Sequence, residues 1–230
     1  MADIWDSLAE PLALSLRLGV LTGGILVVVA TPLAWWICGR KGVLRAALET
    51  LLSLSIVLPP SVLGFYLLMA FGGSGWLGQF WQSTFGAPLA FSFTGLLLGS
   101  LIYALPYVIQ PIVAGFDMIG KRPLELAASL GMSPLVVFFQ VALPLARHSV
   151  VMGGVLGFAH TLGEFGVVLM IGGSIPGETQ VMSIAIYDHV EAMEYDKAHL
   201  LSGVLLGLSF ILLVILSWLK TRMIRKPLHA

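Results

Sequence analysis

Residues 89–115 read LAFSFTGLLLGSLIYALPYVIQPIVAG and contain no Asp, Glu, Lys or Arg. At about 1.5 Å of rise per residue, a helix of this length crosses the roughly 30 Å hydrocarbon core of a bilayer. Four other stretches are comparably long and apolar. The sequence therefore predicts an all-α polytopic membrane protein with about five membrane-spanning helices. We place these helices at 12–38, 50–71, 89–115, 149–171 and 200–219.

The composition of the chain excludes several classes of protein. Of its 230 residues, 58% are hydrophobic and only 10% are charged, and the mean hydropathy is +0.97. A soluble domain carries roughly 25% charged residues, and the predicted helices lack the polar faces that a soluble protein would need. A formal net charge of zero argues against a nucleic-acid partner. Because Cys38 is the one cysteine and His and Asp do not cluster, the sequence predicts neither an internal disulfide nor a metal site.

The positions of the basic residues predict the orientation in the membrane. Ten of the twelve Lys and Arg fall on one side of a five-span layout: Arg40, Lys41, Arg45, Lys121, Arg122, Arg147, Lys220, Arg222, Arg225 and Lys226. Basic residues concentrate in cytoplasmic loops, so we expect the N-terminus outside and the C-terminus in the cytoplasm. The expected layout is a short periplasmic segment at 1–11, one transmembrane domain at 12–219 with a cytoplasmic third loop at 119–148, and a basic cytoplasmic tail at 220–230.

The third loop has the local signals of two short helices. Pro123 suits the first turn of a helix, where Glu125 complements the helix dipole. Gly131 is suited to end that helix in a left-handed conformation, and Ser133-Pro134 is suited to start another. Two interpretations fit the apolar side chains of the loop: a helix that lies on lipid, or a helix presented to a groove on a soluble partner. These side chains are Leu124, Leu126, Ala127, Leu130 and Val136.

A motif in the same loop favours the second interpretation. Its positions are Glu125, Ala127, Ala128, Gly131, Val141, Leu143 and Pro144. This spacing resembles the EAA loop of the permeases of type I ABC importers, although Leu126 stands where that family usually has alanine. The resemblance implies a homodimeric permease of the bacterial inner membrane whose loop couples to a cytoplasmic ABC ATPase dimer, with a periplasmic or lipid-anchored oxyanion-binding protein as third partner. A bare ion channel, the alternative, leaves the loop unexplained.

The sequence predicts that this chain binds no cofactor of its own. It contains no GxxxxGK[ST] phosphate-binding loop. No Ser/His/Asp arrangement suggests an enzyme either. The resemblance therefore implies that ATP and Mg²⁺ bind to the separate ATPase subunit, and that this chain is a transport subunit.

Three further segments concern the transported substrate. Val57–Phe65, Leu162–Gly166 and Ile175–Thr179 are similar to segments of the permeases of molybdate importers. Sulfate and thiosulfate permeases share the first two, so the third segment favours molybdate. Tungstate has the same charge and shape as molybdate, and remains an alternative together with sulfate and thiosulfate.

Two intramembrane features are candidates for the translocation path. Pro59 and Pro60 must break the second span, because each removes a backbone donor and clashes with the preceding turn. The break is either a packing kink or a half-helix whose positive end, around Ser61, faces a transported anion. In the fourth span, Gly163 and Glu164 form the second feature. An intramembrane carboxylate must face protein or water. We expect Glu164 to pair with His160, four residues earlier, or with a basic group from another helix, or else to contribute to a gate.

Overall fold

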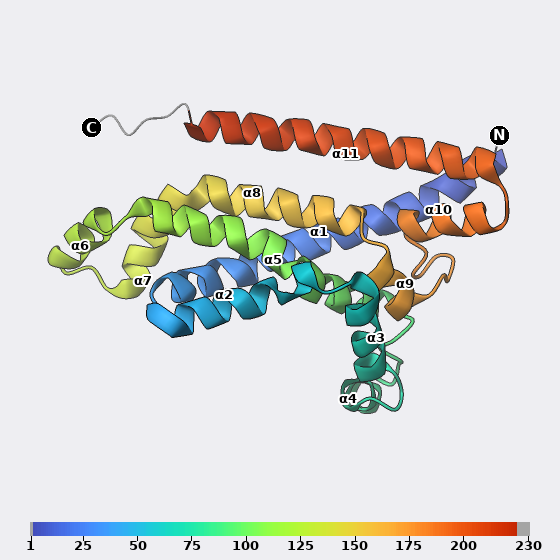
Figure 1. Cartoon of the computed structure of the whole chain (residues 1–230), viewed down its shortest axis with the longest axis horizontal. Coiled ribbons are helices and arrows are strands. Elements are labelled where there is room, and N and C mark those ends of the chain that lie inside the picture. Colours follow the sequence, from blue (N-terminus) through green and yellow to red (C-terminus); the bar gives the residue numbers. More distant parts are fainter. Residues whose placement is uncertain (1, 225–230) are drawn as a thin grey trace.

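The computed structural model describes residues 2–224, all of whose regular elements are helices. Four long helices run side by side along the long axis of the molecule (Figure 1): α1 (Ala2–Cys38), α5 (Phe93–Ile119), α8 (Leu143–Leu162) and α11 (Tyr195–Ile224). Shorter helices connect them: α2 (Gly42–Val57), α3 (Pro60–Phe71), α4 (Trp76–Phe85), α6 (Arg122–Ser129), α7 (Pro134–Val137), α9 (Gly166–Gly172) and α10 (Met182–Glu191). A π-helical turn, Phe138–Ala142, joins α7 to α8.

The core lies where α1, α5 and α8 pack together. Its fully buried side chains include Ala30, Ala34 and Ile37 of α1, Ala104, Val108 and Ile112 of α5, and Ala146 of α8. Glycine allows the backbones to approach closely, since a Cβ on Gly153 would lie 2.7 Å from the carbonyl oxygen of Val108. Helices in lipid gain little from hydrophobic burial against one another, and small residues at close contacts are their usual means of packing.

The outer helix α11 presents a long apolar surface. Its exposed side chains include Leu206, Phe210, Ile211, Leu213 and Val214. In water such a surface would be a large unpartnered apolar patch. The same surface is what a membrane-spanning helix offers to lipid, so the exposure of α11 agrees with the predicted fold class.

The predicted number of spans is confirmed, with one of the five strongly bent. Within residues 2–224, four segments are each long and apolar enough to cross a membrane: Leu8–Cys38, Phe93–Ile119, Pro134–Leu162 and Tyr195–Trp218. The fifth is the pair α2 and α3, bent by 103° at its break. In Figure 1, α3 and α4 accordingly turn away from the long axis of the bundle.

The boundaries of the fourth span differ from the prediction of 149–171. The spanning helix begins at Pro134 and ends at Leu162. It extends further toward the N-terminus because the π-helical turn passes directly into α8, in which Pro144 occupies the first turn, where a proline is tolerated. It ends earlier because Gly163 caps it, and residues 166–172 form the separate helix α9.

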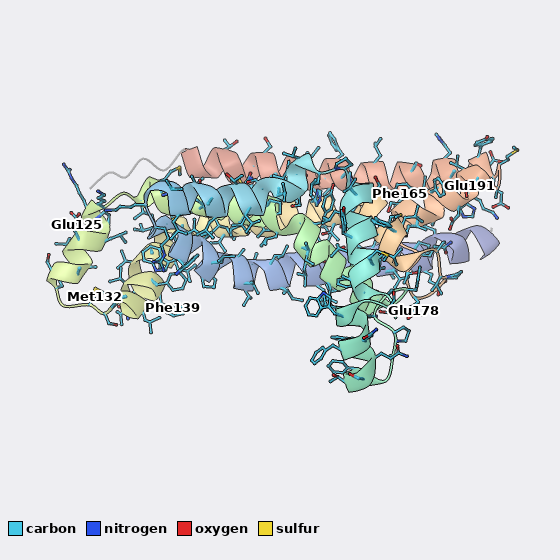
Figure 2. The ribbon with its side chains drawn as sticks, turned by 60° about the horizontal axis from the view of Figure 1, so that its bottom comes forward. Glu125, Met132, Phe139, Phe165, Glu178 and Glu191 are labelled. Atoms are coloured by element: carbon cyan, nitrogen blue, oxygen red, sulfur yellow. The ribbon has the colours of Figure 1, made fainter. Side chains whose placement is uncertain are left out.

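The two ends of the bundle carry different elements. Figure 2 places Glu125, Met132 and Phe139, from the third loop, at one end and Phe165, Glu178 and Glu191 at the other. We call the first the α6–α7 end. The orientation of this end toward the cytoplasm stays a prediction. Residues 2–10 of the expected periplasmic segment are part of α1, residues 220–224 of the expected tail are part of α11, and residues 225–230 lie outside the described part of the chain.

Candidate functional site: the third loop and two broken spans

The third loop contains the predicted pair of short helices joined by a glycine turn. Helix α6 carries Glu125 in its first turn and ends at Gly131, whose φ is +75°. The amide of Gly131 donates to the carbonyl oxygen of Ala128 (3.0 Å), and the amide of Met132 donates to that of Ala127 (3.2 Å). This pair of bonds is a Schellman motif, in which a left-handed residue satisfies the last carbonyls of a helix. The prediction for Gly131 is therefore confirmed.

The second short helix is the beginning of the fourth span. Pro134 is its first residue, as predicted, and the backbone of Ser133 is extended, but the Ser133 hydroxyl makes no capping bond. Pro144 would remove one hydrogen bond from a regular helix and clash with the preceding turn. The π-helical turn at Phe138–Ala142, just before it, widens the helix at that point. The α7 part of the loop is thus continuous with a spanning helix.

The loop projects an apolar ridge from the α6–α7 end. Leu126, Leu130, Leu135 and Phe139 are each more than 60% exposed. Ala127 is buried, and Leu124 packs against the core that α1, α5 and α8 form. Glu125 and Ala128 are exposed beside the ridge. One face of the loop therefore fixes it to the bundle, while the opposite face offers contiguous apolar side chains of the kind that a helix inserts into a groove of a partner.

The break in the second span exposes the start of a half-helix. Helix α2 ends at Val57 and α3 begins at Pro60. Pro59 and Pro60 have no amide hydrogen, and the amide of Val62 donates to the carbonyl oxygen of Pro59 (2.9 Å). Ser61 is exposed, and its backbone amide is the first N–H of α3. This amide donates to no backbone carbonyl among the described residues. This helix end therefore offers one backbone donor in addition to its partial positive charge.

The structure brings the two predicted path elements together. A Cβ on Gly166, at the start of α9, would lie 2.9 Å from the Cβ of Pro60 and 3.6 Å from the amide nitrogen of Ser61. One turn further along α3, a Cβ on Gly64 would lie 2.9 Å from the Cβ of Met170. The breaks of the second and fourth spans consequently lie side by side, and glycine on each helix permits that contact.

The predicted pairing of Glu164 with His160 is wrong. Residues four apart meet only on a continuous helix, and α8 ends at Leu162, between the two. His160 instead stacks on the ring of Tyr107, with 3.7 Å between the ring centroids. Glu164 is 3% exposed, and its carboxylate oxygens have no hydrogen-bond partner among the described residues.

The surroundings of Glu164 are polar but only weakly bonded. The Ser100 hydroxyl, also buried, interacts with the carboxyl group but falls short of hydrogen-bond geometry. The Ser183 hydroxyl donates to the backbone carbonyl of Glu164 (2.6 Å) and not to its side chain. Ser100 and Tyr107 are not among the residues that the sequence predicted for this site. Their spacing with Tyr103 on α5, three and then four residues, places all three on one helix face and is a signal that could have found them.

Ile175–Thr179, the segment that favours molybdate, forms a tight turn at the end opposite the third loop. The Thr179 hydroxyl is fully buried, donates to the carbonyl oxygen of Gly172 (2.8 Å) and accepts from the amide of Ile175 (3.0 Å). Gly177 has a φ of +76°, and Glu178 is exposed. Within the described residues, no group of three His, Cys, Asp or Glu side chains is placed to hold a metal ion.

The sequence profile of one family covers most of the chain. Residues 26–225 match the family described as the binding-protein-dependent transport system inner membrane component. The chain belongs to this family. Together with its apolar helices, this membership makes it a multi-pass protein of the bacterial inner membrane, with the fold of an ABC transporter permease.

Several members of the family are similar to the chain over most of their length. The molybdenum transport system permease protein ModB of Azotobacter vinelandii is 48% identical over 87% of this chain and 88% of its own length. The protein of the same name from Haemophilus influenzae is 37% identical over 83% and 84% of the two chains. A sulfate transport system permease protein, CysT of Synechocystis, is 27% identical over 96% of this chain and 78% of its own.

A solved structure confirms the architecture. A chain of a bacterial alginate ABC transporter, in complex with its alginate pentasaccharide-bound periplasmic protein, superimposes with a TM-score of 0.68. The match covers 96% of this chain and 80% of the other at 15% sequence identity. At this identity the comparison shows that the two chains share a fold.

Proposed function

We propose that this chain is the permease subunit of an ATP-driven importer that moves molybdate across the cytoplasmic membrane. The observation that carries the proposal is the third loop, whose exposed apolar ridge continues directly into a spanning helix. The high identity to molybdenum permeases over nearly nine-tenths of the chain supports molybdate as the substrate. Tungstate, and sulfate or thiosulfate, remain the alternatives within the family.

In this proposal two copies of the chain form the pathway, and each third loop docks into a groove of one cytoplasmic ATPase. The apolar ridge, with Leu126 and Leu130 at its centre, would bury itself in that groove. ATP binding would draw the ATPases together and move both loops. Because α7 and α8 belong to one spanning helix, motion of α7 would be transmitted along that helix to the break at Gly163. This chain itself performs no chemical step.

The paired breaks suit a path for a divalent oxyanion. The start of α3 provides partial positive charge without a fixed cation, so it attracts the anion without holding it tightly. Arg17 of α1 makes a cation–π contact, with its guanidinium carbon 4.4 Å from the centroid of the Phe93 ring. Weak binding of the anion along the path is appropriate where a separate binding protein provides the affinity. That protein would deliver the anion at the end that carries Ile175–Thr179.

The test is uptake of labelled molybdate into vesicles that contain the chain, its ATPase and the binding protein. We expect ATP-dependent uptake that excess unlabelled tungstate suppresses and that sulfate suppresses less. Equal suppression by sulfate would assign the chain to sulfate transport. Uptake that persists without the ATPase would contradict the importer mechanism.

A further inference from the structure

A cleft of about 690 Å³, lined by charged and aromatic side chains, opens at the α6–α7 end, away from the paired breaks. It lies between the turn that joins α1 to α2 and the turn that joins α5 to α6. Both turns can be followed in Figure 1 at the end of the bundle that carries α6 and α7. The third loop itself forms part of the wall, through Lys121 and Leu124.

The cleft has an excess of positive charge. Of its four basic residues, Arg45 is neutralised: its guanidinium bonds both oxygens of Asp117 (3.1 and 2.5 Å) and Glu49 (2.7 Å). Asp117 is the one acidic residue of the lining and is occupied by this contact. Among the described side chains, no carboxylate lies within ion-pair distance of Arg40, Lys41 or Lys121. All three side chains are exposed and therefore available to an anion.

The other side of the cleft is aromatic and rigid. Trp35 packs against Phe116 and Phe138, with ring centroids 5.3 and 5.8 Å apart. Trp36 is 43% exposed, and the guanidinium of Arg40 lies 4.5 Å from the centre of its ring. Tryptophan is enriched at the boundary between hydrocarbon and head groups. The cleft therefore combines unpaired cations with a membrane-interface aromatic pair, at the level where α1 and α5 end.

We propose that this cleft binds the phosphate of an anionic phospholipid. Three unpaired cations recognise an oxyanion, and basic pockets between spanning helices are suited to acidic head groups. A free phosphate or molybdate ion has the same oxyanion chemistry. The exposed ring of Trp36 and the side chain of Leu124 favour the lipid, because they offer apolar surface to the glycerol and upper acyl chain.

A bound head group would act on the coupling loop. Lys41 precedes α2 and Lys121 precedes α6. One phosphate held between them would therefore link the turn between α1 and α2 to the start of α6. Acidic lipid would then stabilise the position of α6. This consequence rests on the proposed function, whereas the binding itself does not.

The test measures lipid retention by the assembled complex of permease and ATPase, using native mass spectrometry. The probes are phosphatidylglycerol and phosphatidylcholine. We expect selective retention of phosphatidylglycerol by the wild type and its loss in K41Q/K121Q, with about a fivefold weaker retention for each charge removed. R147Q is the matched control, because Arg147 is exposed near the start of α8 but lies outside the cleft. The variant K41R/K121R keeps both charges and should retain the lipid.

Several outcomes would overturn the proposal. They are equal retention of the two lipids, retention by K41Q/K121Q at the wild-type level, and equal loss in R147Q. Displacement of phosphatidylglycerol by millimolar phosphate or molybdate would assign the cleft to a free oxyanion. If K41Q/K121Q fails to assemble, the single variants K41Q and K121Q give the same comparison. Because retention is scored without transport, a failure of the importer assignment would leave this result unaffected.

Discussion

At the scale of single residues, conformations that depend on neighbours in the chain were predicted correctly, whereas contacts between distant helices were not. Gly131 and Pro134 depend on their immediate neighbours in the chain, and both adopt the predicted conformations. The surroundings of Glu164 depend on whether α8 continues past Leu162, and the helix instead ends there with Gly163 as its C-cap residue. No sequence spacing indicates that its carboxyl group interacts with Ser100, because that contact joins two helices.

The turn at Gly131 leads to the first prediction. A Cβ there meets no atom within 4 Å, so the cost of substitution comes from the positive φ alone. We expect Gly131→Val to cost about 1–2 kcal/mol in this turn and to displace α6. ATPase stimulation by the loaded binding protein and molybdate uptake should both fall, at normal membrane insertion. Gly131→Asn is the matched control, since asparagine tolerates a left-handed conformation; equal loss in both variants would remove the backbone argument.

The carboxyl group of Glu164 gives the second prediction. When a buried polar group has no hydrogen-bond partner, removing it leaves no other buried donor or acceptor unsatisfied. We therefore expect Glu164→Leu to leave the thermal unfolding midpoint of the complex unchanged or higher, a change within about 1 kcal/mol. A clear fall would reveal a hydrogen bond or ion pair to this carboxylate. Glu164→Gln keeps the shape, so a Gln variant that assembles but does not transport would place the carboxylate in the transport cycle.

At the scale of elements, the sequence predicted where helices break better than how far they turn. Two adjacent prolines require an interruption at Pro59, but they do not by themselves set the angle of 103°, at which α3 packs closely on α9. That contact depends on Gly64 and Gly166, which are distant in sequence. The fourth span likewise begins at Pro134 and not at residue 149 as predicted. A π-helical turn accommodates Pro144, where the sequence suggested a helix boundary.

The bend itself can be removed by mutation. In Pro59→Ala/Pro60→Ala, each alanine favours a continuous helix by about 3 kcal/mol, so α2 and α3 should straighten. The start of α3 would then leave Gly166, and its positive end would disappear. We expect uptake to fall strongly while ATPase stimulation falls less, because the third loop is untouched. Both activities are to be normalised to the amount of assembled complex, and a parallel decline after that correction would mean that the prolines serve packing alone.

At the scale of the whole molecule, the two ends of the bundle have different chemistry. One end carries the basic turns, the apolar ridge and the cleft beside Lys121. The other carries the turn at Ile175–Thr179 and the exposed acidic residues Glu178 and Glu191. Charge distribution along the sequence was sufficient to separate these ends, because consecutive spans alternate in direction. The face that would meet a second copy in the proposed dimer could not be predicted, since apolar helix surfaces can face either lipid or another helix.

The orientation predicted from this asymmetry can be tested by labelling single cysteines in spheroplasts. The background is Cys38→Ala, because Cys38 is the one native thiol. Ser74→Cys, between α3 and α4, and Glu178→Cys, at the end opposite the third loop, are at exposed positions and should react with an impermeant maleimide added outside. Ser133→Cys, exposed between α6 and α7, should react only after permeabilisation. Thr179 is unsuitable as a probe because its side chain is fully buried. Labelling of Ser133→Cys from outside, with Ser74→Cys protected, would reverse the orientation and leave the third loop unable to meet a cytoplasmic ATPase.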